Sequence, residues 1–79
     1  MKIWILRERW DWHNDDPEDE TQAFTRKEDA LTALWLEFRR YEKAWYEDID
    51  WREEEDERAT IVTYSEDYYT SWVEEIELR

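Results

Sequence analysis

The segment of the chain that decides the fold is residues 25–45, TRKEDALTALWLEFRRYEKAW. Its first four residues match a capping box, in which Thr25 accepts a hydrogen bond from a free backbone N–H and Glu28 reaches back. Apolar residues then recur at the three- and four-residue spacings of one helix face: Leu31, Leu34, Trp35, Phe38, Tyr41 and Trp45. We therefore predict an amphipathic helix that starts beside Thr25 and ends between Glu47 and Asp50.

Segments on both sides of this helix have the composition of strands. Residues 2–10 are rich in β-branched and aromatic residues and are apolar on both faces, which predicts an interior strand. Residues 21–24 could form a short second strand that pairs back on the first. After the helix, residues 60–64 and 68–78 predict a hairpin joined by a turn at residues 65–67.

Alternation in the last predicted strand is imperfect. Glu74 falls on the same face as Trp72 and Ile76, which predicts either a bulge near Glu74 or an edge position for the strand. The simplest way to bury these apolar faces is a single α+β domain over residues 1–79. We expect a two-layer sandwich of order β-β-α-β-β, with one helix packed on a sheet of three or four antiparallel strands.

Composition sets the class of protein. A chain of 79 residues with seven Trp, five Tyr and two Phe has the aromatic content to build a dense small core. There is no cysteine, so disulfides and Cys-based zinc sites are excluded. The apolar run from Ile3 to Leu6 is too short for a signal peptide or a membrane span. We expect a soluble, cytoplasmic protein that does not bind membranes.

Charge is the most informative feature of the sequence. Asp and Glu number 24 against 11 Lys and Arg, for a net charge of -13, whereas solubility needs a magnitude of only about 2–8. The acids gather in residues 11–20, 47–57 and 66–77, and we predict the acidic run at residues 53–57 to be a solvated loop or a frayed helix end. The candidate partner-binding residues are Asp15, Asp16, Glu18, Asp19, Glu20, Glu53, Glu54, Glu55, Asp56, Glu57, Glu66, Asp67, Glu74, Glu75 and Glu77.

Clustered carboxylates of this kind can imitate a nucleic-acid backbone. Glu75 and Glu77 on one strand face would project about 6.6 Å apart, near the separation of successive phosphates. A groove lined with Arg and Lys would bind such a track by the electrostatics that it uses for DNA. Tyr68, Tyr69 and Trp72 would either add contacts to a partner or pack within the sheet.

Other kinds of site find little support. The only histidine, His13, lies in an acidic loop, and the chain has no glycine for a phosphate-binding loop, so we expect no enzyme and no cofactor. A divalent cation among His13 and the acids of residues 11–19 is the alternative site, although that segment lacks the glycine of a calcium loop. No segment is basic, so the protein should not bind nucleic acid itself.

Small size, acid excess, an aromatic-rich composition and the absence of cysteine together resemble the phage-encoded DNA-mimic inhibitors, the anti-restriction and anti-CRISPR proteins. The stretches KIWIL at residues 2–6, FTRKEDA at 24–30 and VEEIEL at 73–78 are also similar to small phage proteins of β-α-β type. The first resemblance implies an inhibitor that occupies the basic DNA-binding groove of a host defence complex, with a CRISPR effector as the first target. Two alternatives stay open: an interaction module with an aromatic sheet face, and an inhibitor bound away from the DNA groove.

Overall fold

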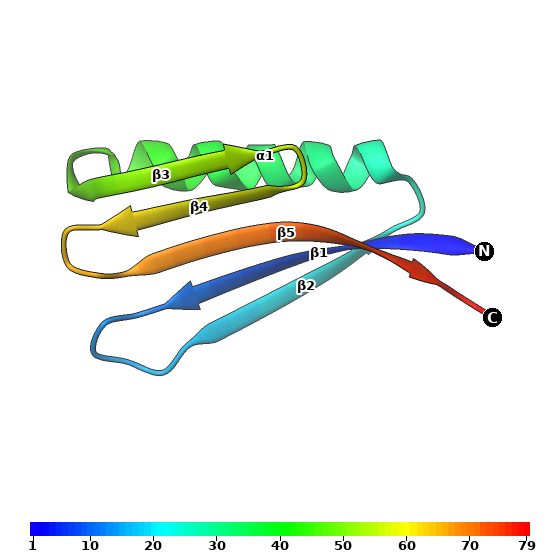
Figure 1. Ribbon diagram of the computed structural model, residues 1–79, viewed down its shortest axis with the longest axis horizontal. Coiled ribbons are helices and arrows are strands. Elements are labelled where there is room, and N and C mark those ends of the chain that lie inside the picture. Colours follow the sequence, from blue (N-terminus) through cyan, green and yellow to red (C-terminus); the bar gives the residue numbers. More distant parts are fainter.

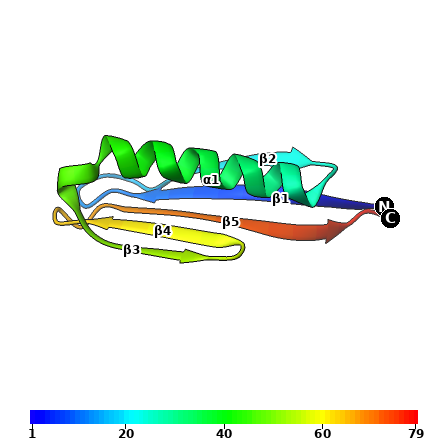
Figure 2. The same ribbon diagram turned by 90° about the horizontal axis from the view of Figure 1, so that it is seen from above.

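A computed structural model describes the whole chain, Met1–Arg79. The elements in chain order are β1 (Lys2–Asp11), β2 (Glu18–Phe24), α1 (Lys27–Ala44), the 3-10 turn η1 (Tyr46–Asp48), β3 (Ile49–Glu55), β4 (Arg58–Thr63) and β5 (Tyr68–Glu77). The strands form one antiparallel sheet in the order β2-β1-β5-β4-β3, and α1 lies along one of its faces (Figure 1, Figure 2). The other face of the sheet, called the open face below, carries no second layer.

The predicted class is confirmed: one helix packs on an antiparallel sheet, and β1 is an interior strand. The strand count was wrong, because the sheet has five strands rather than three or four. The additional strand is β3, and it includes residues 53–55, which we expected to be loop or frayed helix. β3 is an edge strand, and charged side chains are common on edge strands, so its run of glutamates did not identify it as a strand in the sequence.

The face of β5 that carries Trp72, Glu74 and Ile76 is not the one that the helix covers. Tyr69, Ser71 and Val73 face the helix and are buried, so Trp72 and Glu74 lie on the open face. The β1–β5 register runs without interruption past Glu74 and β5 is the central strand of the sheet, so both the predicted bulge and the predicted edge position are wrong. The sheet irregularity lies instead in β3, between Ile49 and Trp51. Pairing with the buried residues of β1 therefore decides which face of β5 is covered.

The helix starts and ends differently from the capping-box prediction. Residue 26 is the N-cap, and no side chain caps the first turn. Glu28 instead pairs with the Arg26 guanidinium. At the other end α1 stops at Ala44, short of the predicted range, and η1 carries the chain on to Asp48. No helix in the structure is both long enough and apolar enough to cross a membrane.

The core lies between α1 and the three middle strands of the sheet. Its buried apolar residues are Leu6, Trp10, Ala30, Leu34, Phe38, Ala59, Ile61, Tyr69 and Val73. Tyr69 stands at its centre, with ring centroids 4.6 Å from Tyr41 and 5.4 Å from Trp10. The Tyr69 hydroxyl donates a 2.7 Å hydrogen bond to Oε2 of Glu8, which is itself only 8% exposed. The sheet thus carries one buried carboxylate beneath the helix.

The β4–β5 turn forms without glycine, as the composition required. Glu66 takes a left-handed backbone conformation with φ of 66°, the only positive φ in the chain. The turn is closed by backbone bonds from Glu66 N–H to the Thr63 carbonyl and from Thr63 N–H to the Asp67 carbonyl, each 3.0 Å. A left-handed conformation costs a residue with a Cβ about 1–2 kcal/mol.

Glu66→Gly is therefore expected to be more stable than Glu66→Ala by about 1 kcal/mol, because only glycine adopts this conformation without a steric penalty. Both variants lose the contact between the Glu66 carboxylate and His13, so the alanine variant controls for that loss. Urea unfolding followed by tryptophan fluorescence measures the difference. Equal stability of the two variants would show that the turn is not strained at Glu66.

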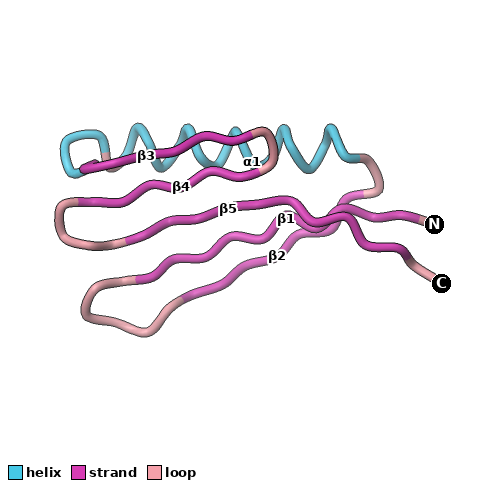
Figure 3. Tube along the Cα trace, in the orientation of Figure 1, coloured by secondary structure: helices cyan, strands magenta, loops and turns pink.

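The molecule is elongated, with extents of 43 × 23 × 16 Å. The two chain ends lie side by side, and the Leu78 N–H donates a 2.7 Å bond to the Met1 carbonyl. The β1–β2 loop and the β4–β5 turn lie at the opposite end of the molecule (Figure 3). The two acidic segments that contain them are therefore brought together.

Candidate partner-binding surface

The first group of candidate acids gathers at the end of the molecule away from the termini. The backbone N–H of His13 donates a 2.9 Å bond to the Asp67 carboxylate, and its Nδ1 lies 3.2 Å from Oε2 of Glu66. These contacts join the loop that holds Asp15 and Asp16 to the β4–β5 turn. The acids do not converge on a common point, and no group of three Asp, Glu or His side chains is placed to hold a metal ion.

A second group lies on the edge strand β2, and it is divided between the two faces of the sheet. Asp19 pairs with Arg9 on the open face at 3.3 Å. Glu18 lies on the helix side and accepts a 3.1 Å bond from the Trp12 indole. Glu20, also on the helix side, has neither a cation nor a hydrogen-bond donor as partner.

The acids at the end of β5 are matched by positive charge. Glu74 accepts bonds from the Trp72 indole at 2.8 Å and from Arg7 at 2.9 Å, and these donors lower the pKa of its carboxyl. Glu75 and Glu77 share a strand face, as the predicted charge track requires. However, Glu75 lies 3.8 Å from the Lys2 ammonium and Glu77 lies 3.5 Å from the N-terminal ammonium. Each carboxylate of this track therefore has a cation beside it.

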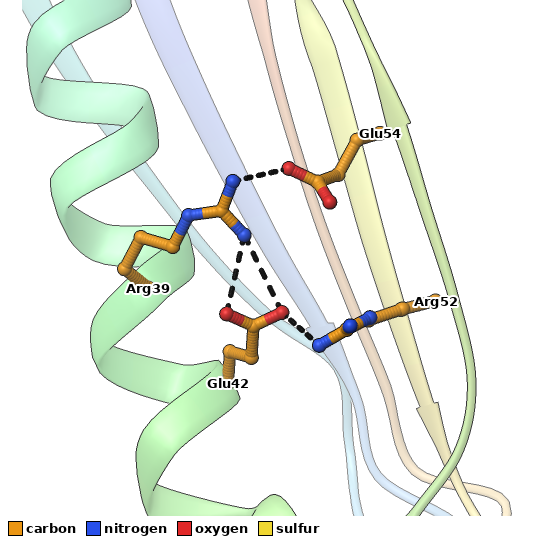
Figure 4. Close-up of polar contacts among 4 residues, drawn as sticks. All are labelled: Arg39, Glu42, Arg52 and Glu54. Carbon is orange, nitrogen blue, oxygen red and sulfur yellow. Dashed lines mark hydrogen bonds and ion pairs between the residues drawn. The ribbon is translucent and has the colours of Figure 1, made fainter.

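Residues of β3 that point toward the helix are also paired. Glu42 of α1 contacts both Arg39 and Arg52, and Arg39 also binds Glu54, so α1 and β3 are tied by a four-residue network (Figure 4). The Arg39 Nη1 to Glu42 Oε1 distance is 3.1 Å. Beyond the end of β3, Glu57 pairs with Lys27 at the start of α1. These contacts hold the edge strand to the body of the protein.

The opposite side of β3 is different, because its carboxylates have no partners. Trp51, Glu53 and Glu55 alternate along the open face. Neither glutamate has an ion pair or a hydrogen bond, and the same is true of Asp50 and Asp56. Trp51 is 48% exposed, and Tyr68 of β5, at 44%, is exposed on the same face. We call Asp50, Trp51, Glu53, Glu55, Asp56 and Tyr68 the β3 surface.

A shallow groove of about 350 Å³ runs across the β3 surface. Trp51, Glu53 and Glu55 form one side of it, and Tyr68 with Thr60 and Thr70 forms the other. Arg58 lines it as well, with its guanidinium carbon 6.0 Å from the centroid of the Trp72 ring. The groove therefore combines free carboxylates with aromatic surface, which is the pairing that anchors arginine-rich partners.

Sequence reasoning missed the aromatic half of this surface. Of the three aromatics that it singled out, Tyr69 is buried beneath the helix and Trp72 is half-buried, so only Tyr68 is freely exposed. Trp51 was overlooked because the run of acids that follows it was interpreted as a loop or a frayed helix end. Its alternation with Glu53 and Glu55 is the signal that could have identified both the strand and its exposed face.

Both edges of the sheet are acidic, since β2 carries Glu18, Asp19 and Glu20 and β3 carries a longer run. Like charge on both edges opposes pairing with a second copy of the chain, and this accounts for part of the acid excess. It does not account for the exposed Trp51 and Tyr68 between the free carboxylates. No family model, no curated protein and no solved structure matches this chain.

Proposed function

We propose that this protein is a non-enzymatic inhibitor that imitates nucleic-acid charge and blocks the basic DNA-binding surface of a host defence complex. The observation that carries the proposal is the β3 surface, where the unpartnered carboxylates of Asp50, Glu53 and Glu55 line shallow hollows together with the exposed rings of Trp51 and Tyr68. On the resemblance to phage DNA mimics, the first target to test is a CRISPR effector. The protein would then act in the host cytoplasm and would need no cofactor.

Charge density supports this proposal. Spread along the 43 Å long axis, the net charge of -13 corresponds to one charge per about 3.3 Å, close to the roughly 3.4 Å per phosphate of one DNA strand. A groove that contacts one DNA strand would therefore meet a comparable density of negative charge along this molecule, whereas the whole duplex, with one charge per about 1.7 Å, is about twice as dense. Binding by this route depends on charge pairs and weakens as salt rises.

Two charge-reversed variants separate the β3 surface from the rest of the charge. Glu53→Lys/Glu55→Lys removes free carboxylates, whereas Glu75→Lys/Glu77→Lys reverses carboxylates that already face cations. Each variant changes the net charge from -13 to -9, so a purely diffuse attraction would weaken equally in both. Circular dichroism checks that each variant is folded.

The experiment is a pull-down from bacterial lysate with the tagged protein, washed at low and high salt. We expect a DNA-binding complex that is retained at low salt, shed at high salt and displaced by added duplex DNA. It should be lost from Glu53→Lys/Glu55→Lys and retained by Glu75→Lys/Glu77→Lys. A partner that is indifferent to salt and to duplex DNA, or a variant at residues 53 and 55 that binds unchanged, would contradict charge mimicry by the β3 surface.

The open aromatic face favours a second candidate, an interaction module in which the acids only keep the protein soluble. Here Trp51 and Tyr68 would be the anchors, because Tyr69 is buried in the core. This function predicts a complex that withstands high salt and is lost on Trp51→Ala/Tyr68→Ala. The charge-reversed variant at residues 53 and 55 would still bind.

A further inference from the structure

A second groove lies at the other edge of the sheet, between α1 and β2. Its volume is about 460 Å³. Trp10, Trp12 and Tyr41 supply its aromatic walls, and the polar residues that line it are Glu18, Asp19, Glu20, Glu37 and Arg40. The β3 surface contributes no residue to it. The groove is thus a separate feature with its own aromatic and acidic composition.

Negative charge in this groove exceeds the positive charge available to it. Glu37 pairs with Arg40 at 2.6 Å, and the Trp12 indole binds Glu18. Glu20 has no partner. Glu8 of β1 lies opposite Glu20 in the β1–β2 pairing and is buried. Its Oε2 accepts a hydrogen bond from the Tyr69 hydroxyl, and its Oε1 accepts none. Burial, together with the charges of Glu37 and Glu20, raises the pKa of the Glu8 carboxyl.

The one cation in the groove shows which chemistry it accommodates. The Arg40 guanidinium lies 5.2 Å from the centroid of the Tyr41 ring while it pairs with Glu37. A guanidinium can stack on an aromatic face and bond a carboxylate at the same time, because it is planar and carries its donors in its plane. Trp12 and Glu20 also line the groove, on its β2 side, and no cation of this chain pairs with Glu20.

We propose that this groove binds a guanidinium group, the side chain of an arginine from a partner protein, between the Trp12 ring and the Glu20 carboxylate. A lysine ammonium would also be attracted by the charge of the carboxylate. However, it has no planar group to stack on the ring, and it cannot form two parallel hydrogen bonds with one carboxylate. A metal ion does not fit, since no three acidic side chains are placed to coordinate one. The site goes beyond the proposed function, because guanidinium binding here requires neither charge mimicry nor the β3 surface.

The test is a titration of the isotopically labelled protein at low salt with N-acetyl-arginine amide and, separately, N-acetyl-lysine amide. The readout is the NMR signals of the indole N–H groups, with those of Trp10 and Trp12 assigned from the Trp10→Phe and Trp12→Phe variants. We expect arginine amide to shift the Trp12 signal with about threefold higher affinity than lysine amide. Glu20→Gln should weaken arginine binding about fivefold, the worth of about one exposed charge-assisted hydrogen bond.

Glu53→Gln is the matched control, since it removes one free carboxylate from the opposite edge with the same change in net charge. It should leave the arginine affinity at Trp12 unchanged. Equal affinity for the two amides, equal weakening by Glu20→Gln and Glu53→Gln, or no shift of the Trp12 signal would each overturn the proposal. Absence of arginine binding at this groove would not change the expected pull-down result at the β3 surface. The two experiments therefore test the two proposals independently.

Discussion

Replacing Tyr69 by alanine is expected to leave a large fraction of the molecules unfolded at 25 °C. The Tyr69 ring is fully buried between Trp10 and Tyr41. Removing an aromatic side chain from such a site costs about 3–5 kcal/mol, and a domain of this length has about 4–12 kcal/mol in total. Tyr69 is also the hydrogen-bond donor to the buried Glu8, so the alanine variant would leave that carboxylate without a partner. Urea unfolding monitored by far-UV circular dichroism measures the loss.

Two companion variants divide this effect into its parts. Tyr69→Phe keeps the ring and removes only the donor to Glu8, so it should cost about 2 kcal/mol. Tyr68→Ala, one residue away but exposed on the open face, should change the free energy of unfolding by less than about 0.5 kcal/mol. If Tyr68→Ala were the more damaging variant, the inner face of β5 would be assigned to the wrong residues.

Glu8→Gln is expected to stabilise the protein by about 1–2 kcal/mol at pH 8. The glutamine keeps an acceptor oxygen for the Tyr69 hydroxyl and removes a charge that the fold buries beneath α1. Glu20→Gln serves as the control, because it removes a neighbouring acid of the same charge from an exposed position. A gain from Glu20→Gln as large as that from Glu8→Gln would mean that general charge repulsion, rather than burial, is responsible.

The effect of Glu8 should depend on pH in a definite direction. Desolvation is the main cause that raises the pKa of Glu8 in the folded protein. The folded state therefore binds a proton more readily than the unfolded state, and the destabilisation by Glu8 is relieved as pH falls through the folded pKa. The advantage of Glu8→Gln over the wild type should be largest at pH 8 and shrink toward pH 5. An advantage that does not vary with pH would show that Glu8 is not desolvated.

The helix was predictable because its signal is local. Spacings of three and four between Leu34, Phe38 and Tyr41 depend on nothing outside the segment. The inner face of β5 was not predictable, because Trp72 and Tyr69 are equally suited to burial. Pairing of Trp10 with Tyr69 places the latter beneath the helix, and that contact joins residues far apart in the chain. Strand β3 was missed because its run of acids favoured a loop and outweighed the alternation of Trp51 with Glu53 and Glu55.

The candidate site, too, could be predicted only in part from the sequence. The sequence located the acidic segments, and the structure separates the acids that have partners from those that do not. Glu74 is bonded to Arg7 from the other end of the chain, while Glu53 and Glu55 form no ion pair, although Arg58 lies opposite Glu55 in the strand pairing. A carboxylate lacks an ion-pair partner when the fold brings no arginine or lysine close to it. The composition of the chain does not determine which residues the fold brings together.

The adjacent chain ends make a rewired form of this protein feasible. A short flexible linker from Arg79 to Met1 would close the backbone, and a new opening in the β3–β4 turn at residues 56–57 would begin the chain with β4 and end it with β3. Every strand pairing of the sheet could be kept in this circular permutant. The β3 strand would then be a terminal segment, which could be exchanged or omitted while the other four strands and α1 stay continuous.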